Sequence, residues 1–459
     1  MKRATKIVLT VLGAGISLGA IFLDLILTGS FGKFGYLQAA VLLVGLAILV
    51  IAYWSQTKSF VLPVVKNLPV ILISLAITLV IIEIILRQFY FPTASPAAYR
   101  KPDPFLGWRL EPNVRMINQN IEFSVPIEYN SRGWRDVEHT LEKPEGTFRI
   151  LVLGDSFMEA YSVALDDAFH RQLESLINES EATHVEVINL GVGGYGTLQE
   201  YRAFMEEGRL YDPDLVLVAF YTTNDVRNNS MEIEAESTET FKVNSRPYLL
   251  PGGSDDWDVV TNNYELAAQE YEEATQQAAE ESKGFSFERL AIVRLIRQAQ
   301  MQKDAQELTS TDANLEQNLS FWIGVHSCEP TPTYDDAWEI TSRIFARLNQ
   351  AVEDSGGQLV VFTVPGLQEV DQEFKDRVEE LDRERNYCLD SLPGNDRLRD
   401  VLTDLDVPML NLTPVFQKKE NTEGIDLYRW TDQHWNEAGH ALAAEQVYEF
   451  LAEQGLLPQ

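Results

Sequence analysis

Cysteine and histidine are scarce in this chain, which contains only 2 and 6 of them among its 459 residues. Asp432 and His434 form an Asp-x-His pair, but no other His, Cys or Asp cluster in the sequence completes a metal-binding shell around it. We therefore expect no metal centre. The chemistry of the motifs described below also requires no organic cofactor.

Basic residues are also few, 37 against 69 acidic ones, and they are unevenly placed. The first 92 residues carry seven basic and two acidic side chains, so the rest of the chain has a net charge of −37. A surface this acidic repels phosphate backbones. We therefore expect no nucleic-acid partner, and the sequence does not indicate an oligomeric state.

Three apolar runs lie within residues 1–92, at Ile7–Thr28, Tyr36–Trp54 and Pro69–Leu86. Each run is close to the ~20 residues that a helix needs to cross a bilayer. Several basic residues precede the first run and separate the second from the third, whereas the first connection holds only Lys33. The positive-inside rule therefore predicts a membrane anchor of three transmembrane helices, with everything after residue 92 outside the cell membrane.

The two cysteines, Cys328 and Cys388, both fall in the part of the chain that is predicted to lie outside. Disulfides form and persist in such compartments. A bridge between them would close a loop of about sixty residues, which stabilises a fold by ~4 kcal/mol in the chain-entropy model. We expect this disulfide, and the alternative is a pair of buried free thiols.

The exported part divides into two regions. Residues 93–147 carry turn and short-strand signals, such as Pro102-Asp103-Pro104 and the alternation from Ile121 to Tyr129, and predict a small β-rich lead-in. Residues 148–459 alternate short apolar strands with helices, which indicates an α/β fold with a parallel sheet covered on both faces. The alternation stops at about residues 228–335, where we expect a helical insertion.

The strands of this sheet are expected where nearly every residue is apolar. These segments are Ile150–Leu153, Val185–Leu190, Leu215–Tyr221, Leu359–Val364 and Pro408–Leu412. Helical patterns separate most of them, including Phe169–Asn178 and Ala337–Glu353. Ligands and reactive groups collect at the carboxyl ends of strands in open α/β sheets, so the turns after these strands are the places to look for chemistry.

A serine and a histidine with a neighbouring acid stand at two such places. Gly154-Asp155-Ser156 directly follows the first strand, and Asp432-Gln433-His434 precedes the last helical stretch. A serine hydroxyl becomes a good nucleophile only when a histidine takes its proton, and an acid orients that histidine. Ser156, His434 and Asp432 therefore form a candidate catalytic triad.

Two other strand ends carry groups that could stabilise negative charge. The glycine-rich segment from Asn189 to Gly196 allows the N–H of Gly194 to approach a reacting oxygen, and Asn224 carries a side-chain amide. The same glycines also match a dinucleotide-binding spacing. That alternative ranks lower because the loop follows the second strand and lies in an exported domain.

Taken in this order, the four motifs resemble those of the SGNH/GDSL hydrolase family, over roughly residues 148–459. The resemblance implies a flavodoxin-like three-layer α/β/α sandwich with about five parallel strands. It also implies that Ser156 is the nucleophile and that Gly194 and Asn224 form the oxyanion hole. Thr222 stands where the family usually has glycine, and Asp432 lies one residue nearer to His434 than the family's usual acid.

The function implied is that of a membrane-anchored, extracytoplasmic serine esterase, which cleaves an ester or acylated-glycan substrate through an acyl-enzyme that water hydrolyses. Two alternatives remain. The Asp-x-His spacing also resembles that of SGNH-like proteins that O-acetylate polysaccharides, so the chain could be an O-acyltransferase acting on an envelope polysaccharide. It could also be a membrane-tethered binding module that kept the fold without the chemistry.

Overall fold

The computed structural model divides the chain into two compact units, Met1–Ile85 and Leu86–Gln459. The residues that the structure describes are 9–17, 44–46, 48–49, 70, 73–74, 76–86, 99–119, 122–237, 239–250, 259–281, 290–293, 319, 321–382, 386–430 and 432–458. All those in the first unit are helical. Within the described residues, no helix combines the length and the apolar character needed to cross a bilayer. The three predicted transmembrane helices lie for most of their length outside this set.

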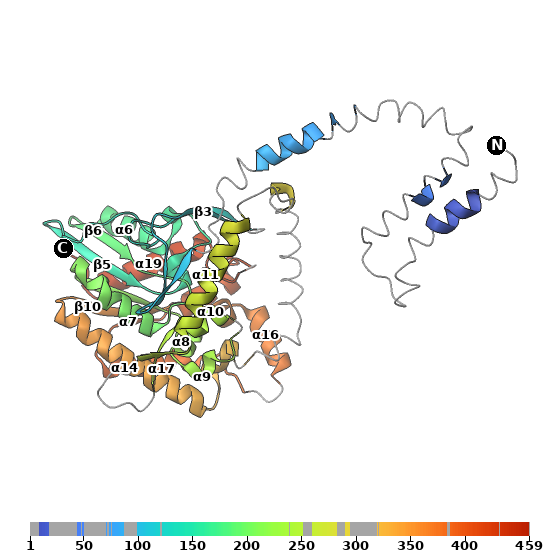
Figure 1. Cartoon of the computed structure of the whole chain (residues 1–459). Helices are drawn as coiled ribbons and strands as arrows, with labels where there is room; N and C mark the ends of the chain where they lie inside the picture. The colour runs from blue at the N-terminus through green and yellow to red at the C-terminus, as the bar shows by residue number, and fades with distance from the viewer. Residues whose placement is uncertain are drawn as a thin grey trace. The chain divides into compact units, whose positions relative to one another are not determined.

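A five-stranded parallel sheet forms the centre of the second unit, in the order β11-β10-β7-β5-β6 (Figure 1). The strands are β5 (Thr147–Leu153), β6 (His184–Asn189), β7 (Leu215–Phe220), β10 (Gln358–Thr363) and β11 (Met409–Leu410). Numbered along the chain, the spatial order is 2-1-3-4-5, which is the flavodoxin-like order. All five strands lie where the sequence predicted them, and the α/β fold class is confirmed.

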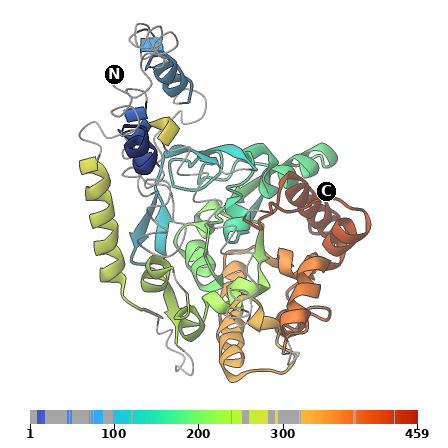
Figure 2. The same cartoon turned by 90° about the vertical axis from the view of Figure 1, so that its right-hand side faces the viewer.

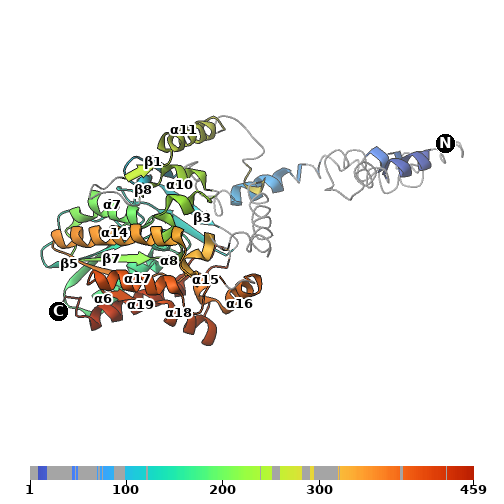
Figure 3. The ribbon, with the colours of Figure 1, turned by 90° about the horizontal axis from the view of Figure 1, so that it is seen from below.

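Helices cover both faces of this sheet (Figure 3). One layer contains α7 (Thr197–Glu206), α14 (Pro332–Asp354) and α17 (Pro393–Asp404), and the other contains α6 (Phe169–Ser180), α18 (Thr413–Gln417) and α19 (Glu437–Glu453). Successive strand side chains point to opposite layers. In β5, Leu151 and Leu153 pack into the first layer, whereas Ile150 and Val152 pack into the second. Burial on both sides explains why the strands read as unbroken apolar runs.

The lead-in forms two small antiparallel hairpins against the main domain. They are β1 (Arg100–Asp103) with β2 (Gly107–Leu110), and β3 (Arg115–Gln119) with β4 (Ser124–Glu128). Trp108 of β2 is fully buried, and its carbonyl accepts a 2.6 Å hydrogen bond from the Tyr195 hydroxyl. This contact ties the lead-in to the glycine-rich loop after β6.

The insertion mixes helices with a β-hairpin. After α5 (Ser156–Glu159) and α8 (Thr222–Asn228) of the core, it contains α9 (Met231–Glu234), α10 (Thr240–Ser245), β8 (Pro247–Leu249), β9 (Val259–Thr261) and α11 (Tyr264–Glu281). Figure 2 shows α11 on the opposite side of the second unit from the C-terminal α19. The hairpin was not predicted, because strands of three residues are too short to show a period-two pattern.

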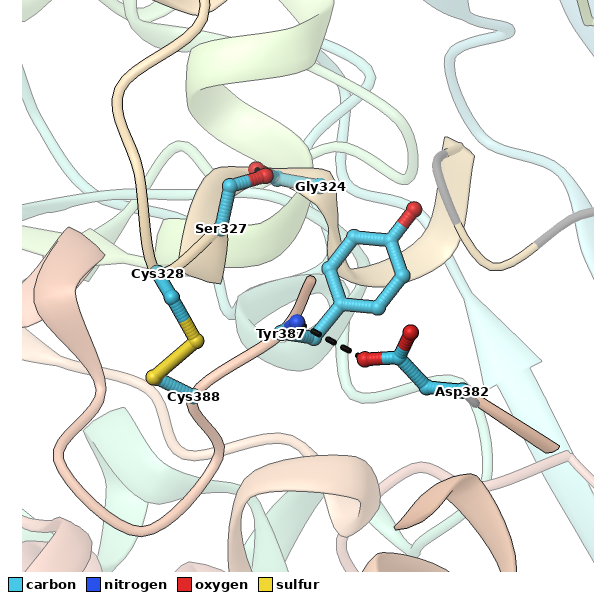
Figure 4. The surroundings of a disulfide bond; sticks show 6 residues. All are labelled: Gly324, Ser327, Cys328, Asp382, Tyr387 and Cys388. Atoms are coloured by element: carbon cyan, nitrogen blue, oxygen red, sulfur yellow. Dashed lines mark hydrogen bonds between the residues drawn. A yellow bond between two sulfur atoms is a disulfide. The ribbon is translucent and has the colours of Figure 1, made fainter. Parts of the chain in front are cut away.

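A disulfide joins Cys328 to Cys388, near the end of the insertion (Figure 4). Backbone bonds flank it on both sides, since the Cys328 N–H donates to the Asn386 carbonyl at 2.7 Å and the Cys388 N–H donates to the His326 carbonyl at 2.9 Å. The loop containing Cys388 follows α15 (Leu367–Val370) and α16 (Gln372–Leu381). The bridge therefore fastens the last residues of the insertion to the loop after α16.

Replacing both cysteines with serine should lower the free energy of unfolding by about 4 kcal/mol, because the unfolded chain regains the freedom of a long loop. Urea unfolding of the full chain in detergent micelles measures this. Dithiothreitol should destabilise the wild type and leave the double variant unchanged. Equal urea midpoints for the wild type with and without reductant would contradict the prediction.

Candidate active site

Ser156 is the first residue of α5, directly after the turn that follows β5. Asp155, the residue before it, caps this short helix, because its carboxylate accepts the Phe157 N–H at 2.9 Å. The other carboxylate oxygen accepts the Asn224 side-chain amide at 2.7 Å. Asp155 is fully buried, so one carboxylate fixes both the turn that carries Ser156 and the side chain of Asn224.

His434 sits on a loop that a buried tryptophan anchors. Trp435 is fully buried, packs against Phe157 at a ring-centroid distance of 5.1 Å, and its carbonyl accepts the Ser162 hydroxyl at 3.2 Å. Gln433 has a φ of 61°, so the chain turns tightly between Asp432 and His434. The His434 ring lies 4.8 Å from the Phe157 ring, beside the start of α5.

The hydrogen bonds of His434 define its tautomer. A carbonyl oxygen can only accept, so the 2.8 Å contact between His434 Nδ1 and the Asp432 carbonyl places the proton on Nδ1. Nε2 is then an unprotonated acceptor, and it lies 2.7 Å from Ser156 Oγ. This is the arrangement in which a histidine can remove the proton of a serine hydroxyl.

The Asp432 carboxylate lies beside the hydrogen bond between His434 Nδ1 and the Asp432 carbonyl. Its Oδ1 accepts the His434 backbone N–H at 3.2 Å and is 3.8 Å from Nδ1, beyond hydrogen-bond length. The tight turn at Gln433 explains the difference from the expected acid–histidine bond, since it brings the Asp432 carbonyl under the ring. Burial raises the pKa of the Asp432 carboxyl, and the nearby His434 opposes this rise.

Tyr161 is a site residue that the sequence did not reveal. Its hydroxyl lies 3.1 Å from His434 Nδ1 and 3.4 Å from Nε2. The Asn118 amide of the lead-in donates to the Tyr161 carbonyl at 2.9 Å and holds the residue in place. Burial raises the pKa of Tyr161 well above its usual range, so its hydroxyl stays neutral beside the imidazole.

The two predicted oxyanion residues, Gly194 and Asn224, line the same cavity as Ser156. Gly194 has a φ of 81°, which favours glycine, and within the described residues its N–H makes no hydrogen bond. Thr222, in the position of the family's usual glycine, directs its hydroxyl to Asn395 at 2.6 Å. Asn224 still lines the cavity with Thr222 present, and one N–H of its amide is donated to Asp155.

A buried carboxylate that no sequence motif indicates holds the glycine loop. Glu159 accepts the Gly193 N–H at 2.6 Å and the Tyr129 hydroxyl at 2.8 Å. Arg100 of β1 lies 3.4 Å from the same carboxylate. Because Glu159 is one helical turn after Ser156, α5 positions both the serine and the loop that faces it.

The cavity beside Ser156 has a volume of about 570 Å³. Its walls come from three parts of the chain that are far apart in sequence. The lead-in supplies Tyr99, Arg100, Met116, Ile117, Asn118 and Tyr129, and the core supplies Ser156, Glu159, Tyr161, Gly193, Gly194, Asn224, Arg227, Asn228 and His434. The insertion supplies Glu234, Glu236, Ser237, Glu239, Lys242, Arg246, Phe321 and Trp322.

Two more acidic residues, Glu200 and Asp225, are buried close enough to Asp155 to interact with its charge. Glu200 of α7 is 1% exposed, and neither of its carboxylate oxygens has a hydrogen-bond partner among the described residues. Asp225 is fully buried and accepts the Tyr221 N–H at 2.7 Å. Burial raises the pKa of both groups well above their usual range, with added repulsion from Asp155 on Glu200 and from Glu200 and Asp155 on Asp225. Neutral carboxyl groups are favoured here, because unpaired buried charge is costly.

Glu200→Gln should therefore raise the melting temperature, and the gain should grow from pH 5 to pH 8. A carboxyl whose pKa is raised by folding contributes its stability below the unfolded pKa and loses it as the pH rises, by up to ~1.4 kcal/mol per pH unit. Thermal unfolding at four pH values tests this. Glu272→Gln, on the exposed face of α11, is the control. A gain that does not change with pH would contradict the assignment.

Comparison with known proteins places these features in a family. The model of the GDSL-like lipase/acylhydrolase family matches residues 152–387. A second model, the SGNH hydrolase-like domain of the acetyltransferase AlgX, matches residues 327–459. No curated protein matches the chain.

Solved structures of several esterases are similar to the chain. An acetyl xylan esterase, AlAXEase, is 11% identical with a TM-score of 0.35, over 66% of this chain and 100% of its own. The lipase/acylhydrolase from Enterococcus faecalis is 11% identical with a TM-score of 0.31, over 67% and 96%. Esterase EstA from Pseudoalteromonas sp. is 10% identical with a TM-score of 0.31, over 67% and 99%.

These scores are low, and the assignment rests on the family model, which matches more than half of the residues. The chain belongs to the GDSL-like lipase/acylhydrolase family, and its second unit contains an SGNH hydrolase-like domain.

Proposed function

We propose that the protein is a serine esterase in which Ser156 is the nucleophile and His434 is the general base. The 2.7 Å hydrogen bond from the Ser156 hydroxyl to His434 Nε2 carries this proposal, because the opposite ring nitrogen already holds its own proton. Ser156 Oγ attacks the ester carbonyl while its proton passes to Nε2. The imidazolium that forms is stabilised by the Asp432 carbonyl and by the carboxylate 3.8 Å from Nδ1.

The tetrahedral intermediate carries its negative charge on the former carbonyl oxygen. The N–H groups of Ser156 and Gly194 and the amide of Asn224 donate to that oxygen. His434 then protonates the leaving alcohol, the carbonyl re-forms, and the acyl group stays on Ser156. A water molecule deprotonated by His434 attacks the acyl-enzyme and releases the acid. The scheme uses neither a metal nor an organic cofactor.

The preformed serine–histidine pair favours an enzyme over a non-catalytic binding module. The pair opens on a cavity of about 570 Å³, which is large enough for a substrate. A module that had lost its chemistry would not need to retain the tautomer that Asp432 and His434 establish. The geometry thus supports catalysis, although the fold alone supports either reading.

We propose that residues 1–92 anchor this enzyme in the cell membrane and that its catalytic domain lies outside. The hydropathy of the three apolar runs and the placement of their basic flanks support the anchor. The described helical residues of the first unit also expose apolar side chains, such as Val11 at 68% and Val70 at 67%. The disulfide between Cys328 and Cys388 fits an oxidising compartment.

An O-acyltransferase acting on an envelope polysaccharide is the second candidate, and the match of residues 327–459 to the acetyltransferase AlgX domain favours it. The same residues would form the acyl-enzyme. A sugar hydroxyl, instead of water, would then attack the acyl group and take it from Ser156. The two candidates differ only in the acceptor.

A fluorophosphonate probe should label the full chain, and the label should disappear in Ser156→Ala. Gel fluorescence of the detergent-solubilised protein measures this. His434→Ala should slow labelling by ~10²-fold or more, because the serine loses its base. Ser237→Ala removes another serine of the same cavity and should label like the wild type. Persistent labelling of Ser156→Ala would refute the assignment of the nucleophile.

The acceptor can be identified with p-nitrophenyl acetate as donor, with and without a soluble polysaccharide. An esterase should release acetate and p-nitrophenol in equal amounts in both cases. A transferase should release less acetate than p-nitrophenol when the polysaccharide is present, and acetyl groups should appear on the glycan by mass spectrometry. That second outcome would replace hydrolysis with transfer as the function.

A further inference from the structure

The side chains around the catalytic cavity indicate what kind of ester it accepts. Among the described residues that line it, only Met116, Ile117 and Phe321 have side chains without a polar atom, glycines aside. A fatty acyl chain needs a continuous apolar channel, because burying it against polar groups leaves them without hydrogen bonds. This lining is suited to a short acyl group on an alcohol that is rich in hydrogen-bonding groups.

The charges on these walls are largely matched in pairs. Arg100 lies 3.4 Å from Glu159, and both Arg227 at 3.1 Å and Arg246 at 3.5 Å contact Glu234. Lys242 pairs with Glu239. Because each cation already has an acidic partner, the walls offer donors and acceptors without attracting a substrate of one sign. A neutral polyol is the chemistry that fits.

An aromatic ring stands open on the same wall. Trp322 is 51% exposed and lines the cavity next to Phe321, whose ring lies 5.9 Å away and edge-on. Phe321 is held in turn by Arg227, whose guanidinium is 4.1 Å from its ring centre. An exposed indole offers a flat apolar face together with an N–H donor. The C–H face and the hydroxyl rim of a sugar ring complement these two features.

We propose that the cavity binds an O-acetylated neutral oligosaccharide, that Trp322 stacks against one of its sugar rings, and that the acetyl ester reaches Ser156. This inference rests on the proposed esterase function and adds its substrate class. The bond cleaved is the acetyl ester, so the sugar hydroxyl recovers a proton from His434 and water supplies the second oxygen of acetate.

The test compares two esters on the full chain in detergent micelles. Acetate release is measured from partially O-acetylated cellopentaose and from methyl acetate, which has neither a sugar nor a ring. Trp322→Ala should lower kcat/KM for the pentasaccharide about tenfold, mainly through KM, and should lower kcat/KM for methyl acetate far less. Trp322→Phe should recover much of the loss, because it restores a flat ring.

Trp430→Ala is the matched control, because Trp430 is 55% exposed and is not among the described residues that line the cavity. It should leave the ratio of the two activities unchanged. An equal loss on both esters in Trp322→Ala, or no loss on the pentasaccharide, would overturn the inference. If the wild type hydrolyses p-nitrophenyl palmitate faster than p-nitrophenyl acetate, the substrate would be a lipid ester instead of an acetylated glycan. Absence of Ser156-dependent hydrolysis of every ester would instead remove the esterase function itself.

Discussion

The chemistry proposed for this site depends on one hydrogen bond, from His434 Nδ1 to the backbone carbonyl of Asp432. It fixes which nitrogen faces Ser156, and a reversed tautomer would present a donor where an acceptor is needed. The left-handed conformation of Gln433 makes the bond possible with a single residue between the two partners. The histidine is therefore oriented by its own backbone turn, and the carboxylate contributes charge from a slightly greater distance.

The fold and the placement of four candidate site residues could be predicted because they depend on local sequence. Each parallel strand is a short apolar run, and Ser156, Gly194 and Asn224 follow three of these runs within a few residues. Once the strands are parallel and adjacent, their carboxyl ends meet at one edge. His434 could be recognised because it precedes a helix and has an acid beside it.

The remaining site residues could not be predicted, because their roles come from contacts across the chain. Tyr161 meets His434 from 273 positions away, and Arg100 meets Glu159 from 59 positions away. No sequence motif joins the two members of either pair. The sequence also could not show which group of Asp432 contacts His434, since its carboxylate and its carbonyl could both approach Nδ1. The left-handed backbone at Gln433 places the carbonyl at hydrogen-bond distance and the carboxylate farther away.

The disulfide has a consequence for one wall of the cavity. Cys328 lies six residues after Trp322, so the covalent bond to Cys388 restrains the end of the segment that forms one wall of the cavity. Before its thiols are oxidised, a chain holds this end of the wall by noncovalent contacts alone, including the backbone hydrogen bonds of Cys328 and Cys388. Ser156 and His434 both lie outside the loop of residues 329–387 that the bridge closes. The covalent restraint therefore acts on one wall of the cavity and not directly on the serine–histidine pair.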